Sequence, residues 1–315
     1  MSLTHSLLRI RAELAKVVYG QDEVIDLALA ALFSCGHVLL EGPPGVAKTL
    51  LVRSIAAALD LDHRRIQMTP DLLPSDVTGS SIYRDDTRVF EFRRGPIFTN
   101  LLLADEINRA SARTQAALLE AMQELQVTYD GTRHPLPEPF LTFATQNPIE
   151  QEGTYPLPLA QLDRFMFKVV VGYPAPQAEL QVLKEHHASA GLAAPERARI
   201  EAVTGAADIL AARQTIRETF VRDEVLAYVQ QLVQATRDHD DLEVGASPRG
   251  GLMLLTGAKS LARFRDRDYV IPDDIQAAFV PALRHRVVLA PTVELEGTSV
   301  DEVLRDILAT VDIPR

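Results

Sequence analysis

The stretch GPPGVAKT occupies residues 42–49, between an apolar run, HVLLE, and a sequence with helical periodicity, LLVRSIAAALD. This order of strand, glycine-rich loop and helix is the context that a phosphate-binding loop requires. The glycines allow backbone N–H groups to point at phosphate oxygens, and the helix N-terminus adds its dipole. Lys48 can then reach the outer phosphates and Thr49 can ligate Mg²⁺. The stretch predicts a nucleotide-binding domain of the α/β class.

One position departs from the general phosphate-loop pattern. Ala47 stands where that pattern has glycine. A methyl group is the smallest possible addition, and alanine is compatible with the helical backbone that we expect beside Lys48. A simple Gly-Pro turn at the end of a buried strand would account for Gly42–Gly45 but not for Lys48 and Thr49, so it is the weaker interpretation.

Two acidic residues end another apolar run, in LLLADEINRA at residues 101–110. The carboxyl end of a neighbouring parallel strand faces the same crevice as the phosphate loop. Asp105 can hold the Mg²⁺ hydration shell, and Glu106 can orient and deprotonate the attacking water. Alone, this pair would indicate a solvated strand end. Together with GPPGVAKT it favours nucleotide hydrolysis.

A third apolar run ends in LTFATQNP, with Gln146 and Asn147 at its end. An amide at this point could hold the water between Glu106 and the terminal phosphate. The alternative is an Asn-Pro turn, which is common.

Two arginines have candidate roles further along the chain. QLDRF places Arg164 just before the run FMFKVVV, and SPRG places Arg249 at the start of a helix with Ser247 as its N-cap. Either arginine alone would usually be a surface ion-pair residue.

Apolar runs alternate with helical stretches, which predicts a mostly parallel, doubly wound sheet with helices on both faces. The expected strands are His37–Gly42, Arg65–Thr69, Asn100–Ile107, Leu141–Thr145 and Met166–Gly172. After Tyr173-Pro174-Ala175-Pro176 the strand signal fades. The expected helices there are Gln177–Ala190, Ala206–Thr219, Asp223–Arg237, Pro248–Arg263 and Pro272–His285. We therefore expect a nucleotide-binding core over residues 1–174 and a smaller all-α domain over residues 175–315.

Two segments have the pattern of β-hairpins inserted into the sheet domain. In the first, Thr78–Tyr83 and Arg88–Phe92 flank Arg84-Asp85-Asp86-Thr87. In the second, Leu125–Tyr129 and Thr132–Leu136 flank Asp130-Gly131, a strong signal for a two-residue turn.

Charge and composition exclude several classes of protein. The 315 residues include 32 Lys and Arg against 43 Asp and Glu, a net charge of −11, so nucleic acid is an unlikely partner. The longest apolar stretch, Ile25–Leu40, is interrupted by Asp26, Ser34 and His37, which excludes a membrane span. The single cysteine, Cys35, cannot form an internal disulfide. The N-terminal pattern lacks an export signal, and we expect a cytoplasmic protein.

The ordered set of motifs resembles the MoxR family of AAA+ ATPases over nearly the whole chain. The motifs are GPPGVAKT, LLLADEINRA, ATQNP, EGTYPLPLAQLDRF and GASPRG, with DYVIPDDI and LRHRVVL near the end. Alanine at position 47 is common in that family. The resemblance implies an αβα P-loop core with five parallel strands, a helical lid and hexameric rings. It also implies that residues 78–92 form the helix-two insert and residues 125–136 the pre-sensor hairpin.

The resemblance further implies roles for individual residues, with ATP and Mg²⁺ as cofactors. Asn147 is similar to sensor one, Arg164 to the arginine finger and Arg249 to the sensor-two arginine, beside Glu106 as the catalytic base. VVYGQ at residues 17–21 is similar to the stretch that lines the adenine pocket. The expected nucleotide-binding residues are Val18, Tyr19, Gly20, Gly42, Pro43, Pro44, Gly45, Val46, Ala47, Lys48, Thr49 and Leu50. The expected metal ligands are Thr49 and Asp105.

Family membership would imply ATP-driven, chaperone-like remodelling or maturation of a protein client, commonly with a protein that contains a von Willebrand factor A domain. The nearest alternative is the motor subunit of a metal-insertion chelatase, which shares the hairpin inserts. A nucleic-acid-translocating motor is disfavoured by the acidic charge and by the lack of a basic tail. A nucleotide-dependent scaffold is a further possibility.

Overall fold

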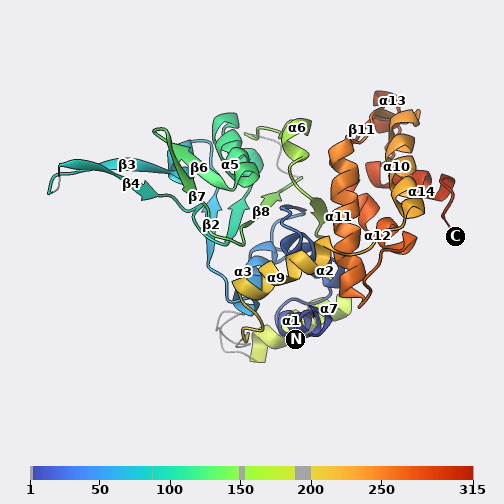
Figure 1. Cartoon of the computed structure of the whole chain (residues 1–315), viewed down its shortest axis with the longest axis horizontal. Coiled ribbons are helices and arrows are strands. Elements are labelled where there is room, and N and C mark those ends of the chain that lie inside the picture. The colour runs from blue at the N-terminus through green and yellow to red at the C-terminus, as the bar shows by residue number, and fades with distance from the viewer. Residues whose placement is uncertain (1–2, 87, 149–152, 189–199, 315) are drawn as a thin grey trace.

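The computed structural model describes residues 3–86, 88–148, 153–188 and 200–314. Figure 1 shows three parts: a central α/β body, a group of helices at one side that contains the C-terminus, and a long hairpin that reaches out on the opposite side.

The central sheet has five parallel strands in the order β2-β5-β8-β1-β9. Their bounds are β1 (Val38–Glu41), β2 (His63–Gln67), β5 (Leu101–Asp105), β8 (Leu141–Gln146) and β9 (Phe167–Val170). All five predicted strands are confirmed. The edge strand β2 begins at His63 rather than Arg65, and only Ile66 in it is buried, so apolar content could not mark its start.

Helices cover both faces of this sheet, because the central strands are apolar on both sides. Leu39 of β1 joins one buried cluster, whereas Val38 and Leu40 join the other. The first cluster contains α4 (Pro74–Thr78), the short turn η1 (Ile107–Arg109) and α5 (Ala112–Glu124). The second contains α1 (Leu3–Leu14), α2 (Asp22–Phe33), α3 (Lys48–Ala58) and α9 (Ala206–Arg217). The αβα arrangement is confirmed.

Both predicted hairpins are present. The first consists of β3 (Gly79–Arg84) and β4 (Val89–Arg94), and it is the long arm in Figure 1; Thr87 of its expected turn lies outside the described residues. The second consists of β6 (Gln126–Tyr129) and β7 (Thr132–Pro135). Asp130 and Gly131 have φ values of 47° and 73°, which a tight two-residue hairpin turn requires.

The two hairpins contact each other through aromatic rings. Phe92 of β4 lies with its ring centroid 5.2 Å from that of Tyr129 and 4.2 Å from that of His134, the second pair being stacked. These ring contacts join the first hairpin to the second one.

The C-terminal part is helical, as predicted. After α6 (Leu159–Leu162) and β9 it contains α7 (Pro176–Ala188), α10 (Asp223–Asp238), α11 (Pro248–Phe264), α12 (Pro272–Leu283), α13 (Pro291–Leu295) and α14 (Val300–Thr310). The end of the predicted helix to Ala190 lies outside the described residues. The all-α expectation omitted a small antiparallel pair, β10 (Leu242–Val244) with β11 (Val288–Leu289). These strands are too short for side-chain alternation to reveal them.

The lid packs closely on the core. Helix α11 contacts α1 and α2, and α12 contacts β9. Helix α9 contacts both α2 and α11, and one buried apolar cluster includes residues from both sides of position 174. The division into residues 1–174 and 175–315 therefore stays a prediction.

Candidate nucleotide site

The phosphate loop connects β1 to α3 and has two features that depend on small residues. A Cβ on Gly42 would lie 2.2 Å from the carbonyl oxygen of Val171, so only glycine fits there. Gly45 has φ of 85°, a conformation that glycine adopts without strain.

Ala47 has φ of 62°, not the right-handed helical backbone that we expected beside Lys48. Left-handed backbone costs alanine about 1–2 kcal/mol, which explains why the general pattern has glycine at this position.

Lys48 is the first residue of α3 and is half-buried at the loop. Its Nζ donates to the carbonyl oxygens of Gly42 at 2.6 Å and of Gln146 at 3.4 Å. Burial lowers the pKa of Lys48 below its ordinary value, whereas the carboxylates of Asp105 and Glu106 oppose that shift. The loop thus holds a cation that an incoming phosphate would stabilise better than carbonyl groups do.

A cavity of about 470 Å³ lies over this loop. Its lining brings together residues from the phosphate loop, from the end of β5 and from the end of β8. They are Pro44, Gly45, Ala47, Lys48, Thr49, Leu50, Arg53, Asp105, Glu106, Thr145 and Asn147. The predicted acids, the predicted amide and the predicted loop therefore converge on one cavity.

Three of the predicted loop residues are not in that lining. Gly42 and Val46 are buried, and Val46 belongs to the apolar cluster that contains α1, α2, α3 and α9. Pro43 is half-buried beside them. These three residues form part of the loop without lining the cavity, whereas Pro44 and Gly45 line it.

Asp105 ends β5 and Glu106 follows it, and both are held by Thr145, which the sequence analysis did not select. The Thr145 hydroxyl donates to Oδ1 of Asp105 at 2.6 Å and accepts from the backbone N–H of Glu106 at 2.8 Å. Glu106 has φ of 58°, which turns the chain sharply between β5 and η1. A hydroxyl one residue before the selected Gln146 and Asn147 was the signal that could have identified Thr145.

Two residues of the edge strand β2 also reach these acids. Arg65 donates from Nη2 to Oδ2 of Asp105 at 2.6 Å and from Nε at 3.0 Å. Gln67 donates from Nε2 to Oε2 of Glu106 at 2.7 Å. Side chains at positions two apart lie on the same face of a strand, so Arg65 and Gln67 act on neighbouring acids. Their sequence, HRRIQ, carried no motif that could have identified them.

The chemistry of this cavity fits MgATP. Thr49 and Asp105 offer the hydroxyl and carboxylate oxygens that Mg²⁺ prefers, and Mg²⁺ commonly takes one or two protein ligands with phosphate and water completing its shell. Among the described residues no group of three or more His, Cys, Asp or Glu side chains could hold a metal ion alone. The substrate's phosphates would therefore have to supply part of the metal shell.

The predicted adenine stretch lies beside the end of β9. The side-chain amide of Gln21 donates to the carbonyl oxygen of Gly172 at 3.0 Å. Gly172 follows Val171, whose carbonyl oxygen packs against Gly42. Val18 is buried, and Gly20 has φ of 67°. None of Val18, Tyr19 and Gly20 is in the cavity lining, so their contact with adenine stays a prediction.

Neither Arg164 nor Arg249 is part of the lining of this cavity. Each is next to or close to a residue of one hydrogen-bonded pair, Asp163 and Ser247. Ser247, the N-cap of α11, lies 3.4 Å from both carboxylate oxygens of Asp163, the residue before Arg164. Asp163 and Ser247 therefore connect the segment after α6, which contains Arg164, to the first turn of α11, which contains Arg249.

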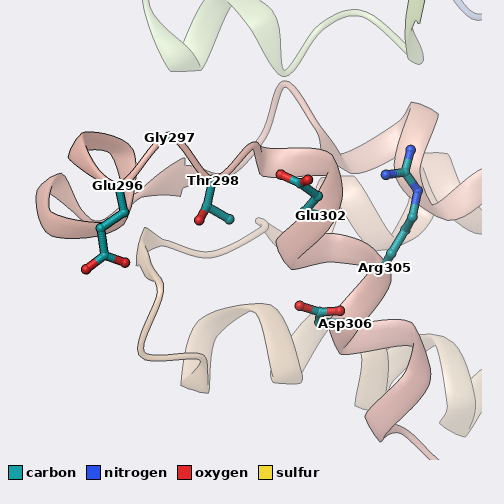
Figure 2. A pocket seen from close by; sticks show the side chains of 6 residues that line it. All are labelled: Glu296, Gly297, Thr298, Glu302, Arg305 and Asp306. Atoms are coloured by element: carbon teal, nitrogen blue, oxygen red, sulfur yellow. The ribbon is translucent and has the colours of Figure 1, made fainter.

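A second cavity, of about 460 Å³, is open to solvent at the turn between α13 and α14. Figure 2 shows Glu296 at one end of it and Arg305 at the other, with Glu302 and Asp306 between them. The Glu302 carboxylate accepts from the Ser299 N–H and hydroxyl at 2.7 Å each, which caps α14. The carboxylate of Glu302 in this cavity is thus engaged in capping α14.

Comparisons with known proteins agree with this geometry. The profile of the ATPase family associated with various cellular activities (AAA) matches residues 37–167, and that of the AAA lid domain matches residues 234–307. The uncharacterized protein YeaC of Bacillus subtilis is 46% identical, over 98% of this chain and 96% of its own length. The chaperone MoxR1 of Mycobacterium tuberculosis is 44% identical, over 99% of this chain and 83% of its own length.

A crystal structure of a predicted ATPase from Cytophaga hutchinsonii superposes with a TM-score of 0.91. It is 41% identical to this chain, and the match covers 99% of this chain and 96% of that one. No helix within the described ranges has the length and apolarity to cross a bilayer.

Proposed function

Because the chain belongs to the MoxR family of AAA+ ATPases, we propose that it hydrolyses MgATP within a homo-oligomeric ring, expected to be a hexamer, and uses the cycle to remodel or mature a protein client. The observation that carries the proposal is a division of the site. Lys48, Asp105, Glu106 and Asn147 line one cavity, whereas Arg164 is not part of its lining. A neighbouring subunit would bring its own Arg164 to this cavity.

The residues of one subunit would bind and orient the substrate. Lys48 and the loop N–H groups would hold the β- and γ-phosphates, and Thr49 and Asp105 would hold Mg²⁺, which neutralises charge on the phosphates when bound. Glu106 would accept a proton from the attacking water, and Asn147 would fix that water against the γ-phosphate.

Arg164 would act on the ATP of the neighbouring subunit. A planar guanidinium stabilises charge that develops on the terminal phosphate, and arginine fingers generally change the rate by about 10³–10⁵-fold. Supplying this group from a neighbour makes hydrolysis depend on assembly. Arg249, connected to the Arg164 segment through Ser247 and Asp163, would act across the same interface.

Mixed rings test this arrangement. Each site has an owner, which supplies Lys48 and Glu106, and a donor, which supplies Arg164. Arg164→Ala and Glu106→Gln should each be nearly inactive alone, yet a mixture contains sites with an intact owner and an intact donor. Partial return of phosphate release is the expected result. Co-assembly without any recovery would place Arg164 in its own subunit's site.

The client is proposed on the family relationship and on the two hairpins that touch through Phe92. We propose a partner with a von Willebrand factor A domain, and a cytoplasmic location in which the exposed thiol of Cys35 stays reduced. The Glu106→Gln variant, arrested with bound ATP, should retain the client in a pull-down. The purified client should then stimulate wild-type hydrolysis, and an absence of stimulation would favour a scaffold.

A further inference from the structure

Arg286 is a buried arginine that joins the lid to the loop carrying Arg164. It lies just after α12, and only 2% of its surface is exposed. Its Nε donates to Oδ1 of Asp163 at 2.7 Å, and its Nη2 donates to the carbonyl oxygens of Asp163 at 3.0 Å and Phe165 at 2.5 Å. Its Nη1 donates to the carbonyl oxygen of Met166 at 3.2 Å. Arg286 thus binds the backbone on both sides of Arg164.

The contacts of Arg286 require a guanidinium. Its Nη1 also contacts the carbonyl oxygen of Ala282 and, at 2.6 Å, Nε2 of His285. Burial lowers the pKa of Arg286 to about 10 against the opposing charge of Asp163, so the group stays cationic at neutral pH. The five N–H donors of the guanidinium match the five oxygen acceptors, whereas a lysine ammonium has only three donors.

The same carboxylate connects this cluster to Arg249. Asp163 lies within 3.4 Å of the Ser247 hydroxyl, which in turn accepts from the N–H of Gly250 at 3.2 Å. Arg249 lies between Ser247 and Gly250 in the first turn of α11. Arg286, by fixing Asp163, therefore fixes the position of Arg164 relative to Arg249.

We propose that Arg286 is the positioning residue that holds Arg164 in the orientation presented to the ATP of the neighbouring subunit. The inference rests on the proposed trans role of Arg164. Arg164 is half-buried and its backbone is held on both sides, so its reach is set before two subunits meet. Because Arg286 belongs to the lid, a change in the lid of one subunit acts on the ATP site of the next.

Single variants give the first measurement. Arg286→Lys keeps the positive charge but loses the fork. We expect its kcat to fall about 10²-fold, as for a reacting group misplaced by about 1 Å, with KM for ATP changed less than about threefold. The matched control is Arg284→Lys in the same turn. Arg284 pairs with Asp301 of α14 at 2.8 Å, away from the loop of Arg164, and its variant should retain wild-type kcat.

Mixed rings give the decisive measurement. The first ring mixes Arg286→Lys subunits with Glu106→Gln subunits. In some of its sites the owner is an Arg286→Lys subunit, which has an intact Glu106. The donor of such a site is a Glu106→Gln subunit, which holds its Arg164 correctly. Activity should partly return. A ring of Arg286→Lys and Arg164→Ala subunits has no competent donor and should stay inactive. The reverse pattern would place Arg286 in its own subunit's ATP site and overturn the proposal.

Two further outcomes separate this inference from the proposed function. If Arg164→Ala and Glu106→Gln subunits complement each other but Arg286→Lys complements neither, despite co-assembly, Arg286 is only structural and this inference fails alone. If Arg164→Ala and Glu106→Gln do not complement each other, the trans role of Arg164 fails, and this inference fails with it.

Discussion

Gln67 donates a hydrogen bond from Nε2 to Oε2 of Glu106 at 2.7 Å, from an edge strand to the residue that we assign as the base. The same carboxylate oxygen lies 3.4 Å from Nη1 of Arg109. These two contacts hold the Glu106 carboxylate in one orientation and occupy an oxygen that would otherwise accept a proton from water. In the structure described here, Glu106 is therefore restrained.

Removal of this restraint should raise basal hydrolysis. We expect Gln67→Leu to increase kcat about threefold to tenfold, the equivalent of the net contribution of one ordinary hydrogen bond, with unchanged affinity for ATP. The rate of phosphate release at saturating ATP measures this change in kcat. Arg64→Ala, on the opposite face of the same strand, is the control and should match wild type. A fall in kcat for Gln67→Leu would show that Gln67 orients Glu106 for catalysis instead.

Lys48 and Glu106 should separate binding from hydrolysis. Lys48→Ala removes the cation that faces the phosphates, and we expect ATP to bind about 10- to 100-fold more weakly. Glu106→Gln keeps the shape of the site, so ATP should bind normally while hydrolysis falls about 10²–10⁴-fold. Titration with a fluorescent ATP analogue and a phosphate-release assay measure the two effects. Normal binding by Lys48→Ala, or normal turnover by Glu106→Gln, would refute the corresponding assignment.

The sequence predicted the parts of this fold that depend on local patterns. The buried parallel strands are apolar on both faces and could be located from that pattern, whereas the start of the polar edge strand β2 was placed two residues too late. Asp130-Gly131 identified its turn because few residues adopt positive φ. The conformation of Ala47 was predicted wrongly, because the backbone of a phosphate loop follows from its closure on β1 and α3 rather than from the propensity of one residue.

Side-chain contacts outside the local motifs could not be predicted. Arg265 and Arg267 alternate with Asp266 and Asp268 in the sequence, a pattern typical of a mixed-charge surface. In the structure both arginines donate to the fully buried Asp274, at 2.7 Å and 2.6 Å. The contacts of Arg286 could not be predicted from LRHRVVL, since its acceptors in Asp163, Phe165 and Met166 lie 120 or more residues away in the sequence.

The pre-sensor hairpin should couple hydrolysis to the client. It links α5, which follows Glu106, to β8, which leads to Asn147, and Tyr129 contacts Phe92 of the other hairpin at 5.2 Å. Replacing Tyr129-Asp130-Gly131-Thr132 with a short Gly-Ser turn should leave basal hydrolysis unchanged and reduce client-stimulated hydrolysis. Phe92→Ala should reproduce the loss, because it breaks the same contact from the other side. If stimulation by the client survives both changes, the hairpin is a structural insert.

The stability of the fold should fall below about pH 6.5 because His37 is buried as a neutral ring. Its Nδ1 accepts from the N–H of Thr142 at 3.0 Å, which leaves Nε2 to donate to the carbonyl oxygen of Met122 at 3.1 Å. Protonation would break the bond to Thr142, and burial lowers the pKa of His37 to about 4. Burial also lowers the pKa of His285, which adds to the effect.

The sign follows from proton binding. Between pH 6.5 and about 4 the unfolded chain binds a proton at His37 and the folded chain does not, so acid favours unfolding. Between pH 7.5 and 5 this residue alone should account for a loss of about 2 kcal/mol in the free energy of unfolding. In urea titrations, His37→Gln should therefore lose about 2 kcal/mol less than wild type over that range, whatever its stability at pH 7.5. His63→Gln, at an exposed position, should follow the wild-type slope. If wild type and His37→Gln lost the same unfolding free energy over this pH range, His37 would be accepting its proton in the folded protein as readily as in the unfolded chain.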